Sequence, residues 1–412
     1  NTNTHSYIEK FSLSPISSLF FAIAFLAIGY GMILTYVGVY LKELGLNDAI
    51  IGLINASFFL GAIGSSIFSQ KIISSVGHIR SFATFASLMV ISFLVQALFF
   101  NEYLWAILRF ISGFAFYALL IILESWLNEK SSNSQRGQIL AIYTIIFYLS
   151  TALGQLFLTI PKDSEFFVFT VGSVLVLFSL ITIAMTKIKE PILKPFEQYS
   201  FPKLYSIVPL ALTGSFIGGF FVGSFFTMLP LTILHKFDST TILSIFMSLT
   251  LIGGLVSQWP IGKLSDKYGR RKLIAFCGFF TAFVSLLFII VPELNSYYYI
   301  LALLLGVTIF AIYPLSLARA NDVLDENKDM VEISRALLFA YGAGSFIAPI
   351  ILGIIFTFLN YEAIFFIYLT IGFFLGLYSL SRKRVADDDM SVFVNFPVTS
   401  GPVAAQLDPR HD

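Results

Sequence analysis

Twelve stretches of this chain are each long enough to cross a membrane as a helix, and they contain a single charged residue between them. A helix needs about 20 apolar residues to span a hydrocarbon layer of about 30 Å. The stretches are residues 11–41, 49–70, 81–101, 103–123, 137–161, 166–186, 204–234, 239–262, 273–292, 294–318, 336–361 and 363–381. The chain has 25 basic and 24 acidic residues, and all but Arg109 lie outside these stretches. This is the charge distribution of transmembrane helices.

The composition excludes an ordinary soluble protein. Only 12% of the residues are charged, and the mean hydropathy is +0.86, whereas a soluble domain has about 25% charged residues. The strands of a membrane barrel would appear as short segments of alternating hydrophobicity, unlike these long uniform stretches. We therefore predict an all-α integral membrane protein whose twelve transmembrane helices contact the lipid bilayer. The net charge of +1 provides no basic surface for nucleic acid.

Lys and Arg are concentrated in alternate loops. With the N-terminus in the cytoplasm, 21 of the 25 basic residues fall in cytoplasmic segments and three on the opposite side. Short cytoplasmic loops of membrane proteins carry such an excess. We predict that both termini are cytoplasmic and that the membrane is the bacterial inner membrane. The first apolar run is too long for a cleaved signal peptide and is predicted to be the first transmembrane helix.

A polar stretch with prolines separates the sixth and seventh predicted helices and divides the chain. The predicted parts are an N-terminal six-helix bundle (11–186), a cytoplasmic linker (187–203), a C-terminal six-helix bundle (204–382) and a polar cytoplasmic tail (383–412). A weak repeat relates the halves: Gly77 corresponds to Gly269, and Gly113 to Gly306, at offsets of about 192 residues. This pattern indicates two pseudo-symmetric bundles.

The loop after the eighth predicted helix, residues 262–272, reads GKLSDKYGRRK. It resembles the G-x-L-x-D-[RK]-x-G-R-[RK] signature of the major facilitator superfamily. The equivalent loop of the first half has Ser74 in place of the carboxylate. Residues 109–113 (RFISG) and the spacing from Glu129 to Arg136 are similar to other elements of the superfamily.

Three further stretches resemble the YcaD-like bacterial branch of that superfamily: residues 77–80 (GHIR), 124–128 (ESWLN) and 313–322 (YPLSLARAND). The resemblance implies a secondary transporter that moves a small-molecule substrate by alternating access, with the proton as the expected coupling ion. Uptake of a siderophore or another polar metabolite is the preferred interpretation. The alternatives are an efflux antiporter for drugs or amphiphiles and a membrane receptor that transports nothing. The fifth predicted helix lacks the G-x-x-x-G-P element of drug antiporters.

Two charged residues are candidates for transport and proton coupling. Arg109 is the only charge within a membrane span, where an unpaired charge costs several kcal/mol. Its expected role is proton coupling or the binding of an anionic substrate, and the alternative is a structural arginine bonded to carbonyls. Glu124 follows 15 residues later on nearly the same helix face. Three roles are open for Glu124: a gate residue that pairs with Arg270 or Arg271, a proton carrier, or a solvated residue at the end of the helix.

Other side chains are candidates by position. The predicted substrate cavity comprises Tyr30, Tyr36, Tyr117, Gln155, Tyr313 and Tyr341. The predicted cytoplasmic gate comprises Gly262, Asp266, Gly269, Arg270, Arg271, Glu129 and Arg136. In the gate, Asp266 is expected to accept hydrogen bonds from the first turn of the fifth helix, near residues 136–137.

Enzymatic and cofactor chemistry are not expected. The chain has one cysteine, and its four histidines are far apart, with no metal-ligand spacing. No phosphate-binding loop, nucleophile triad or pair of catalytic carboxylates occurs in the sequence. We expect a monomer without cofactor or metal.

Overall fold

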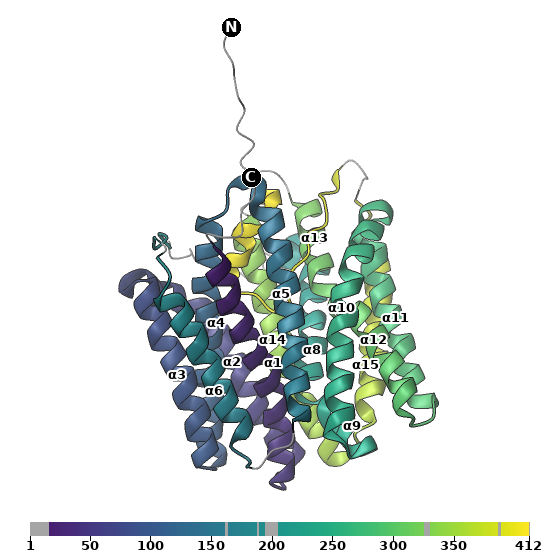
Figure 1. Ribbon diagram of the computed structural model, residues 1–412. Coiled ribbons are helices and arrows are strands. Elements are labelled where there is room, and N and C mark those ends of the chain that lie inside the picture. The colour runs from purple at the N-terminus through teal and green to yellow at the C-terminus, as the bar shows by residue number, and fades with distance from the viewer. Residues whose placement is uncertain are drawn as a thin grey trace.

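The computed structural model describes residues 16–160, 164–187, 189–193, 205–324, 330–385 and 389–411, and its described part is helical with no strands. Twelve helical spans are long and apolar enough to cross a membrane, as predicted. They stand side by side, roughly parallel to one another (Figure 1). The main helices are α1 (Ser17–Glu43), α2 (Asp48–Val76), α3 (His78–Leu98), α4 (Glu102–Glu129), α5 (Arg136–Leu156), α6 (Phe167–Ala184), α8 (Pro209–Thr227), α9 (Leu229–Phe237), α10 (Thr240–Tyr268), α11 (Arg270–Ile290), α12 (Asn295–Ile309), α13 (Ile312–Val323), α14 (Met330–Phe358) and α15 (Ala363–Leu380).

Two of the predicted spans are each built from two helices. The window 204–234 covers α8 and the first part of α9, which meet at Met228, just before Pro230. The window 294–318 falls on α12 and α13, and Pro314 follows the break. Proline has no backbone N–H and fits only the first turn of a helix without loss. It therefore favours a new helix start at both places.

Within each half, an equivalent pair of helices packs closely at an equivalent glycine. A side chain added at Gly113 of α4 would meet the carbonyl of Phe58 in α2. A side chain added at Gly306 of α12 would meet the carbonyl of Thr250 in α10. Small residues allow such close helix contacts in membranes. The repeat predicted from sequence is therefore present in the packing, and the fold consists of two pseudo-symmetric six-helix bundles.

The equivalent loops have the same backbone geometry. Gly77 ends α2 with φ 97° and ψ 158°, and Gly269 ends α10 with φ 92° and ψ 148°. A residue with a side chain rarely adopts this positive φ. These glycines turn the chain sharply from α2 into α3 and from α10 into α11.

We expect Gly113→Ala to destabilise the packing of α4 on α2. The added methyl group would overlap the Phe58 carbonyl, and overpacking of this kind typically costs about 1–3 kcal/mol. The midpoint of thermal unfolding, followed by size-exclusion chromatography of heated protein, should fall by several degrees. Gly64→Ala is the matched control, because its nearest neighbour is the ring of Phe114 at 3.5 Å. Equal midpoints for the two variants would contradict the close contact.

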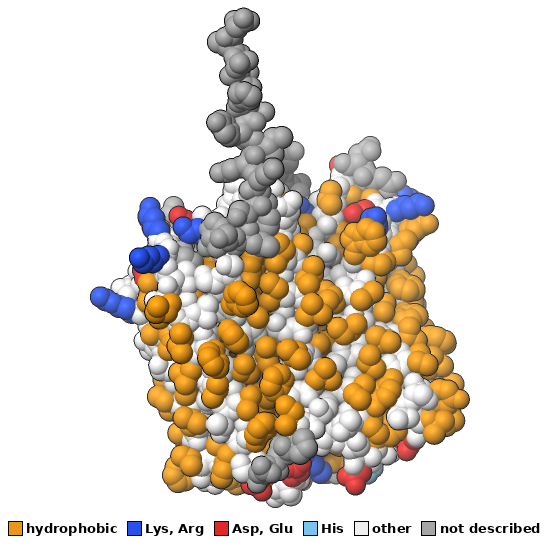
Figure 2. Space-filling model, in the orientation of Figure 1, with side chains coloured by type: hydrophobic (Ala, Val, Ile, Leu, Met, Phe, Trp, Pro, Cys, Tyr) orange, Lys and Arg blue, Asp and Glu red, His pale blue; other side chains and the backbone are white. Residues whose placement is uncertain are grey.

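Charges gather at the two ends of the bundle, and the surface between them is largely apolar (Figure 2). We call one end the basic face, because Lys and Arg dominate it, with the turns at Gly77 and Gly269. The other end, the opposite face, has mainly Asp and Glu (Figure 2). Side chains such as Ile107, Phe283 and Phe374 are more than half exposed between the faces. This is the surface of a multi-pass membrane protein.

The predicted domain limits stay predictions. Most of the linker 187–203 lies outside the described residues, as do residues 11–15 of the N-terminal bundle. Contacts within each half are extensive, and α2 also packs along α14 and α5 along α10 across the two halves.

The last part of the chain is not a polar tail at the surface. Residues 391–411, here called the C-terminal segment, run into the basic side of the bundle (Figure 1). Residues 396–405 are all buried. The segment contains Phe396, Val398, Val403 and Leu407, which fill space between the helices.

Candidate functional site

The two halves are joined at the opposite face by a charged cluster. Asp48, at the start of α2, accepts hydrogen bonds from Lys42 of α1 at 3.0 Å and from the Tyr361 hydroxyl at 3.0 Å. Burial raises the pKa of Tyr361, so its hydroxyl is a neutral donor. Thr357 of α14 donates to Asn47 at 2.9 Å. These contacts tie α1 and α2 to the end of α14.

Further contacts between the two halves lie farther inside the protein, on the side of the opposite face. The hydroxyl of Ser248 in α10 donates to the carbonyl of Ala152 in α5 at 2.7 Å. Gly52 of α2 lies against the backbone of Pro349 in α14. A cavity of about 280 Å³ at the opposite face is lined by Lys42 and Tyr361, among others. The structure is thus closed between the halves at the opposite face.

Glu124 is fully buried in α4, toward the basic face. Its carboxylate accepts hydrogen bonds from the Tyr143 hydroxyl at 2.9 Å and from the backbone N–H groups of Gly401 at 2.7 Å and Ala404 at 3.1 Å. The last two donors belong to the C-terminal segment. A buried carboxylate needs such partners, and here most of them come from a chain segment rather than from the helices.

Three of the predicted cavity tyrosines gather around the same segment. Tyr117 of α4 shares a hydrogen bond of 2.6 Å with the Thr399 hydroxyl. Tyr341 of α14 donates to the carbonyl of Val398 at 3.3 Å, and its ring lies 5.0 Å from that of Tyr313 in α13. These tyrosines come from both halves and lie beside the space that the segment fills.

Three polar members of this group, Tyr143, Tyr148 and Gln258, are not among the residues of the predicted substrate cavity. Tyr143 binds Glu124, as described above. Gln258 of α10 donates to the hydroxyl of Tyr148 in α5 at 2.7 Å and to the carbonyl of Phe396 at 3.1 Å. The signal in the sequence is weak, because Tyr143 and Tyr148 stand among other aromatic residues. Gln258 is distinguished only as an amide at membrane depth, which needs a partner.

Arg109 lies two helical turns into α4 from the opposite face, completely buried. Its guanidinium carbon lies 4.6 Å from the centre of the Phe58 ring. Among the described residues, none of its three guanidinium nitrogens has a hydrogen-bond partner. The carbonyl bonds of a purely structural arginine are therefore not present in the described part of the chain.

Tyr30 lies at the seam between the halves. Its ring stacks on Phe116 of α4 at 4.5 Å and meets Phe226 of α8 edge-on at 5.6 Å. Tyr36 and Gln155 have other surroundings. The hydroxyl of Tyr36 donates to the backbone of Glu165 at 3.2 Å, and Gln155 donates to the carbonyl of Gly31 at 2.6 Å. Gln155 therefore connects α5 to α1, and Tyr36 connects α1 to the turn before α6, both within the first half.

The predicted gate residues lie at the basic face with different partners. Arg270 pairs with Asp266 at 2.6 Å and with Asp322 at 3.2 Å. Arg271 donates to the carbonyls of Leu380 and Arg382. Asp322 belongs to the quoted 313–322 motif, but no spacing in the sequence pairs it with Arg270. These described contacts stay within the second half and do not include Glu124.

The expected contact between Asp266 and the start of α5 is not formed in this conformation. The Asp266 carboxylate instead accepts a hydrogen bond from the backbone N–H of Phe393 at 3.0 Å, and the Phe393 ring covers Gly262. In the first turn of α5, Gly137 faces Pro409. The C-terminal segment therefore lies between the two halves of the predicted gate. Glu129 ends α4 and Arg136 begins α5.

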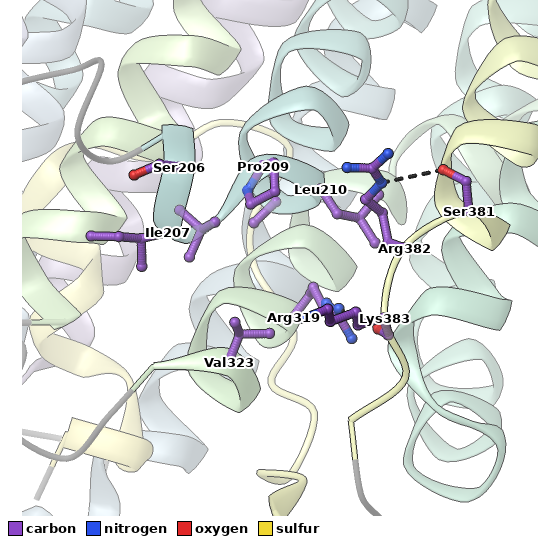
Figure 3. Close-up of a pocket in the computed structure, with 11 residues that line it drawn as sticks. Ser206, Ile207, Pro209, Leu210, Arg319, Val323, Ser381, Arg382 and Lys383 are labelled. Atoms are coloured by element: carbon purple, nitrogen blue, oxygen red, sulfur yellow. Dashed lines mark hydrogen bonds between the residues drawn. The ribbon is translucent and has the colours of Figure 1, made fainter.

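A separate cavity of about 480 Å³ lies at the basic face, lined by the start of α8 and the ends of α13 and α15 (Figure 3). Arg319, Arg382 and Lys383 border it. Arg319 donates to the Lys383 carbonyl at 2.6 Å, and Arg382 donates to Ser381 at 3.2 Å. None of its lining residues belongs to the group around Glu124. Among the described residues, no three metal-ligating side chains gather.

The chain is similar to proteins named as transporters. An uncharacterized MFS-type transporter of Enterobacter sp. (strain 638) is 26% identical over 375 residues, covering 90% of this chain and 96% of that protein. The uncharacterized MFS-type transporter YcaD of Escherichia coli O6:K15:H31 is 24% identical over 337 residues, covering 81% of this chain and 87% of that protein.

Solved structures share the fold. The crystal structure of the nucleoside transporter NupG matches with a TM-score of 0.71 at 16% identity, covering 89% of this chain and 99% of that one. A NupG mutant matches with a TM-score of 0.74 at 14% identity, covering 89% and 98%. The model of the Major Facilitator Superfamily matches residues 19–331 and 211–391. With this match over most of its length, the chain belongs to the major facilitator superfamily, as an MFS-type transporter.

Proposed function

We propose that this protein is a proton-coupled secondary active transporter of the bacterial inner membrane, working as a monomer without cofactor or metal. The basic face is cytoplasmic and both termini lie inside, in accordance with the preference of Lys and Arg for that side. The contacts around Asp48 then close the extracytoplasmic side. In this assignment the structure is an inward-facing state whose cytoplasmic space is filled by the C-terminal segment.

The observation that carries the proposal is the position of Glu124. This fully buried carboxylate lies between the halves, beyond the contacts that close the opposite face, and the chain reaches it from the basic face. A carboxylate there can exchange a proton or bind a donor group from one side only. Alternating access follows if the contacts around Asp48 open while those near Asp266 form.

Arg109 supplies the complementary charge. A buried guanidinium without a hydrogen-bond partner among the described residues is costly, and a transiently bound anion would offset that cost. We propose that Arg109 meets an anionic group of the substrate or responds to the charge of the loaded site. Tyr30, next to Phe116 and Phe226, would line the path between the halves.

The preferred substrate is a polar solute taken up by the cell, such as a siderophore or another polar metabolite. The group around Glu124 offers hydrogen bonds rather than a purely apolar wall, from Tyr117, Tyr341 and Gln258 as well as from the carboxylate. Efflux of amphiphiles is the second candidate, favoured by the ring cluster around Tyr30. Nucleosides join the solutes to be tested, because NupG, which shares the fold, is named a nucleoside transporter.

A thermal-shift screen of purified protein against polar metabolites and iron chelates, amphiphiles and nucleosides tests the proposal. A polar solute that raises the unfolding midpoint supports it. Stabilisation by amphiphiles alone contradicts uptake of a polar substrate and favours efflux.

The orientation has its own test. A reporter that is active only in the cytoplasm, fused after Arg384 at the end of the last span, should be active. A reporter fused at Asn101, in the turn between α3 and α4 at the opposite face, should be inactive there. The reverse pattern would place the basic face outside and contradict the proposed topology.

A further inference from the structure

The C-terminal segment occupies the space around Glu124, Tyr117 and Tyr341. Thr399 and Ser400 are only 4% exposed although they are polar, and Phe396, Val403 and Leu407 are essentially inaccessible. Residues 402–407 form a short 3-10 helix, η5 (Pro402–Leu407), beside α4, α5 and α14. Ordering such a stretch costs backbone entropy, which its contacts with the helices must offset.

The helices bind the backbone of the segment through both its donors and its acceptors. Glu124 accepts from the N–H groups of Gly401 at 2.7 Å and Ala404 at 3.1 Å, at the start of η5. On the other side, Gln258 donates to the Phe396 carbonyl and Tyr341 to the Val398 carbonyl. The space thus binds the segment through its amide donors and its carbonyl acceptors.

Side chains add selectivity for this particular sequence. Tyr117 and Asn128 of α4 make hydrogen bonds with Thr399 at 2.6 Å and with Gln406 at 3.1 Å. A side chain at position 401 would lie 2.7 Å from the Glu124 carboxylate. Only glycine therefore fits at this position without moving Glu124.

The start of the C-terminal segment is bound at the basic face by side chains of the loop 262–272 and of α13. Asp322 accepts from the backbone N–H of Ser391 at 2.8 Å and from its hydroxyl at 2.7 Å, and Arg270 donates to the Ser391 carbonyl. Asp266 accepts from the backbone N–H of Phe393 at 3.0 Å. Asp266 and Arg270, both predicted to close the cytoplasmic gate, are therefore engaged by the segment.

We infer that the space around Glu124 is a peptide-binding site, that its ligand is the chain's own C-terminal segment, and that the segment inhibits transport by occupying it. While bound, the segment uses the acceptor atoms of Glu124 and separates Asp266 from α5. A solute can then neither reach Glu124 nor be enclosed by the halves. Because the segment is tethered, its effective concentration is high, and it must leave before transport begins. The effect on transport rests on the proposed function; the binding does not.

Binding is tested with a fluorescein-labelled synthetic peptide of residues 389–411 and a chain that ends at Val385. Fluorescence anisotropy should show that the peptide binds the shortened chain at least a hundredfold more tightly than the full chain, whose site is filled. Glu124→Gln in the shortened chain should weaken binding at least tenfold, and Glu102→Gln, on the exposed start of the same helix, should not. A scrambled peptide that binds equally well, or equal binding by the full chain, would overturn the inference.

A full-length variant tests the same inference without the risk that the shortened chain misfolds. Gly401→Leu keeps every residue outside the segment but should expel the segment, so that full-length protein now binds the peptide. Val392→Ala changes a side chain that is 70% exposed and should leave the site filled. If Gly401→Leu binds no more peptide than Val392→Ala, the segment is not the ligand.

Transport separates inhibition from mere binding. In proteoliposomes, the shortened chain and Gly401→Leu should transport a solute found by the thermal-shift screen at least tenfold faster than the full chain. Peptide added at the basic face should reverse the gain of the shortened chain. Unchanged rates together with specific peptide binding would overturn inhibition while leaving the binding site in place. Absence of transport in every variant would count against the proposed function and not against the peptide site.

Discussion

Replacing Arg109 with alanine should abolish gradient-driven transport while leaving the protein as stable as before or more stable. The guanidinium is completely buried, and among the described residues its nitrogens have no hydrogen-bond partner. Removing such a group relieves a desolvation cost of several kcal/mol. In the proposed mechanism, Arg109 meets an anionic group only during transport. Loss of this pairing should raise the free-energy barrier of transport by about 2–5 kcal/mol, which lowers the transport rate about 30-fold or more.

The opposite signs of the two effects distinguish this role from a structural one. A structural arginine would lower the unfolding midpoint when removed, together with the rate. Arg80→Ala, at an exposed position of α3 near the basic face, is the matched control and should change neither quantity. Normal transport by Arg109→Ala, measured as solute accumulation in proteoliposomes, would remove Arg109 from the mechanism.

Glu124→Gln should uncouple transport from the proton gradient. Glutamine keeps the shape of the protonated acid but cannot release a proton, so the loaded form should still cross the membrane. We expect accumulation against a gradient to be lost, whereas exchange of labelled for unlabelled solute across the membrane continues. Neutral acceptors also make weaker hydrogen bonds than carboxylates, so the C-terminal segment should be held less tightly through Gly401 and Ala404.

The measurement is a paired assay of net uptake and exchange in the same vesicles. Glu102→Gln, on the same helix at the opposite face, should retain both activities. Loss of exchange together with uptake would mean that Glu124 binds the solute rather than carrying the proton. Retention of both would remove Glu124 from the site.

The transmembrane helices are predictable because lipid disfavours charged residues in each of them, and this constraint acts on each stretch of sequence separately. Charge is largely excluded from the predicted spans, with Arg109 as the one exception, so the twelve spans can be found without any knowledge of tertiary contacts. Glycines at equivalent offsets, such as Gly113 and Gly306, indicate the repeat because only a residue without a side chain fits where the helix backbones touch. The breaks at Met228 and near Ala311 are not predictable in this way, since hydropathy does not distinguish one helix from two.

The candidate site is predictable only in part. Arg109 and Glu124 stand out by charge, and Tyr117 and Tyr341 by helix position. The partners of Glu124 cannot be predicted, because Gly401 and Ala404 lie about 280 residues further along the chain. The C-terminal segment shows no helical or strand periodicity, so the sequence predicts only a polar cytoplasmic tail and does not predict that residues 396–405 are buried. Burial of the segment depends on a space that exists only once the two halves pack.

Proton-coupled transport through this site can be measured as solute accumulation in proteoliposomes. Vesicles with the chain shortened after Val385 are given a pH gradient and a mixture of polar metabolites, iron chelates, nucleosides and amphiphiles, and their contents are identified by mass spectrometry. We predict that a polar solute accumulates above its outside concentration, that collapse of the gradient releases it, and that Arg109→Ala vesicles collect none. Accumulation that persists without the gradient, or that is equal in Arg109→Ala vesicles, would contradict proton-coupled transport through this site.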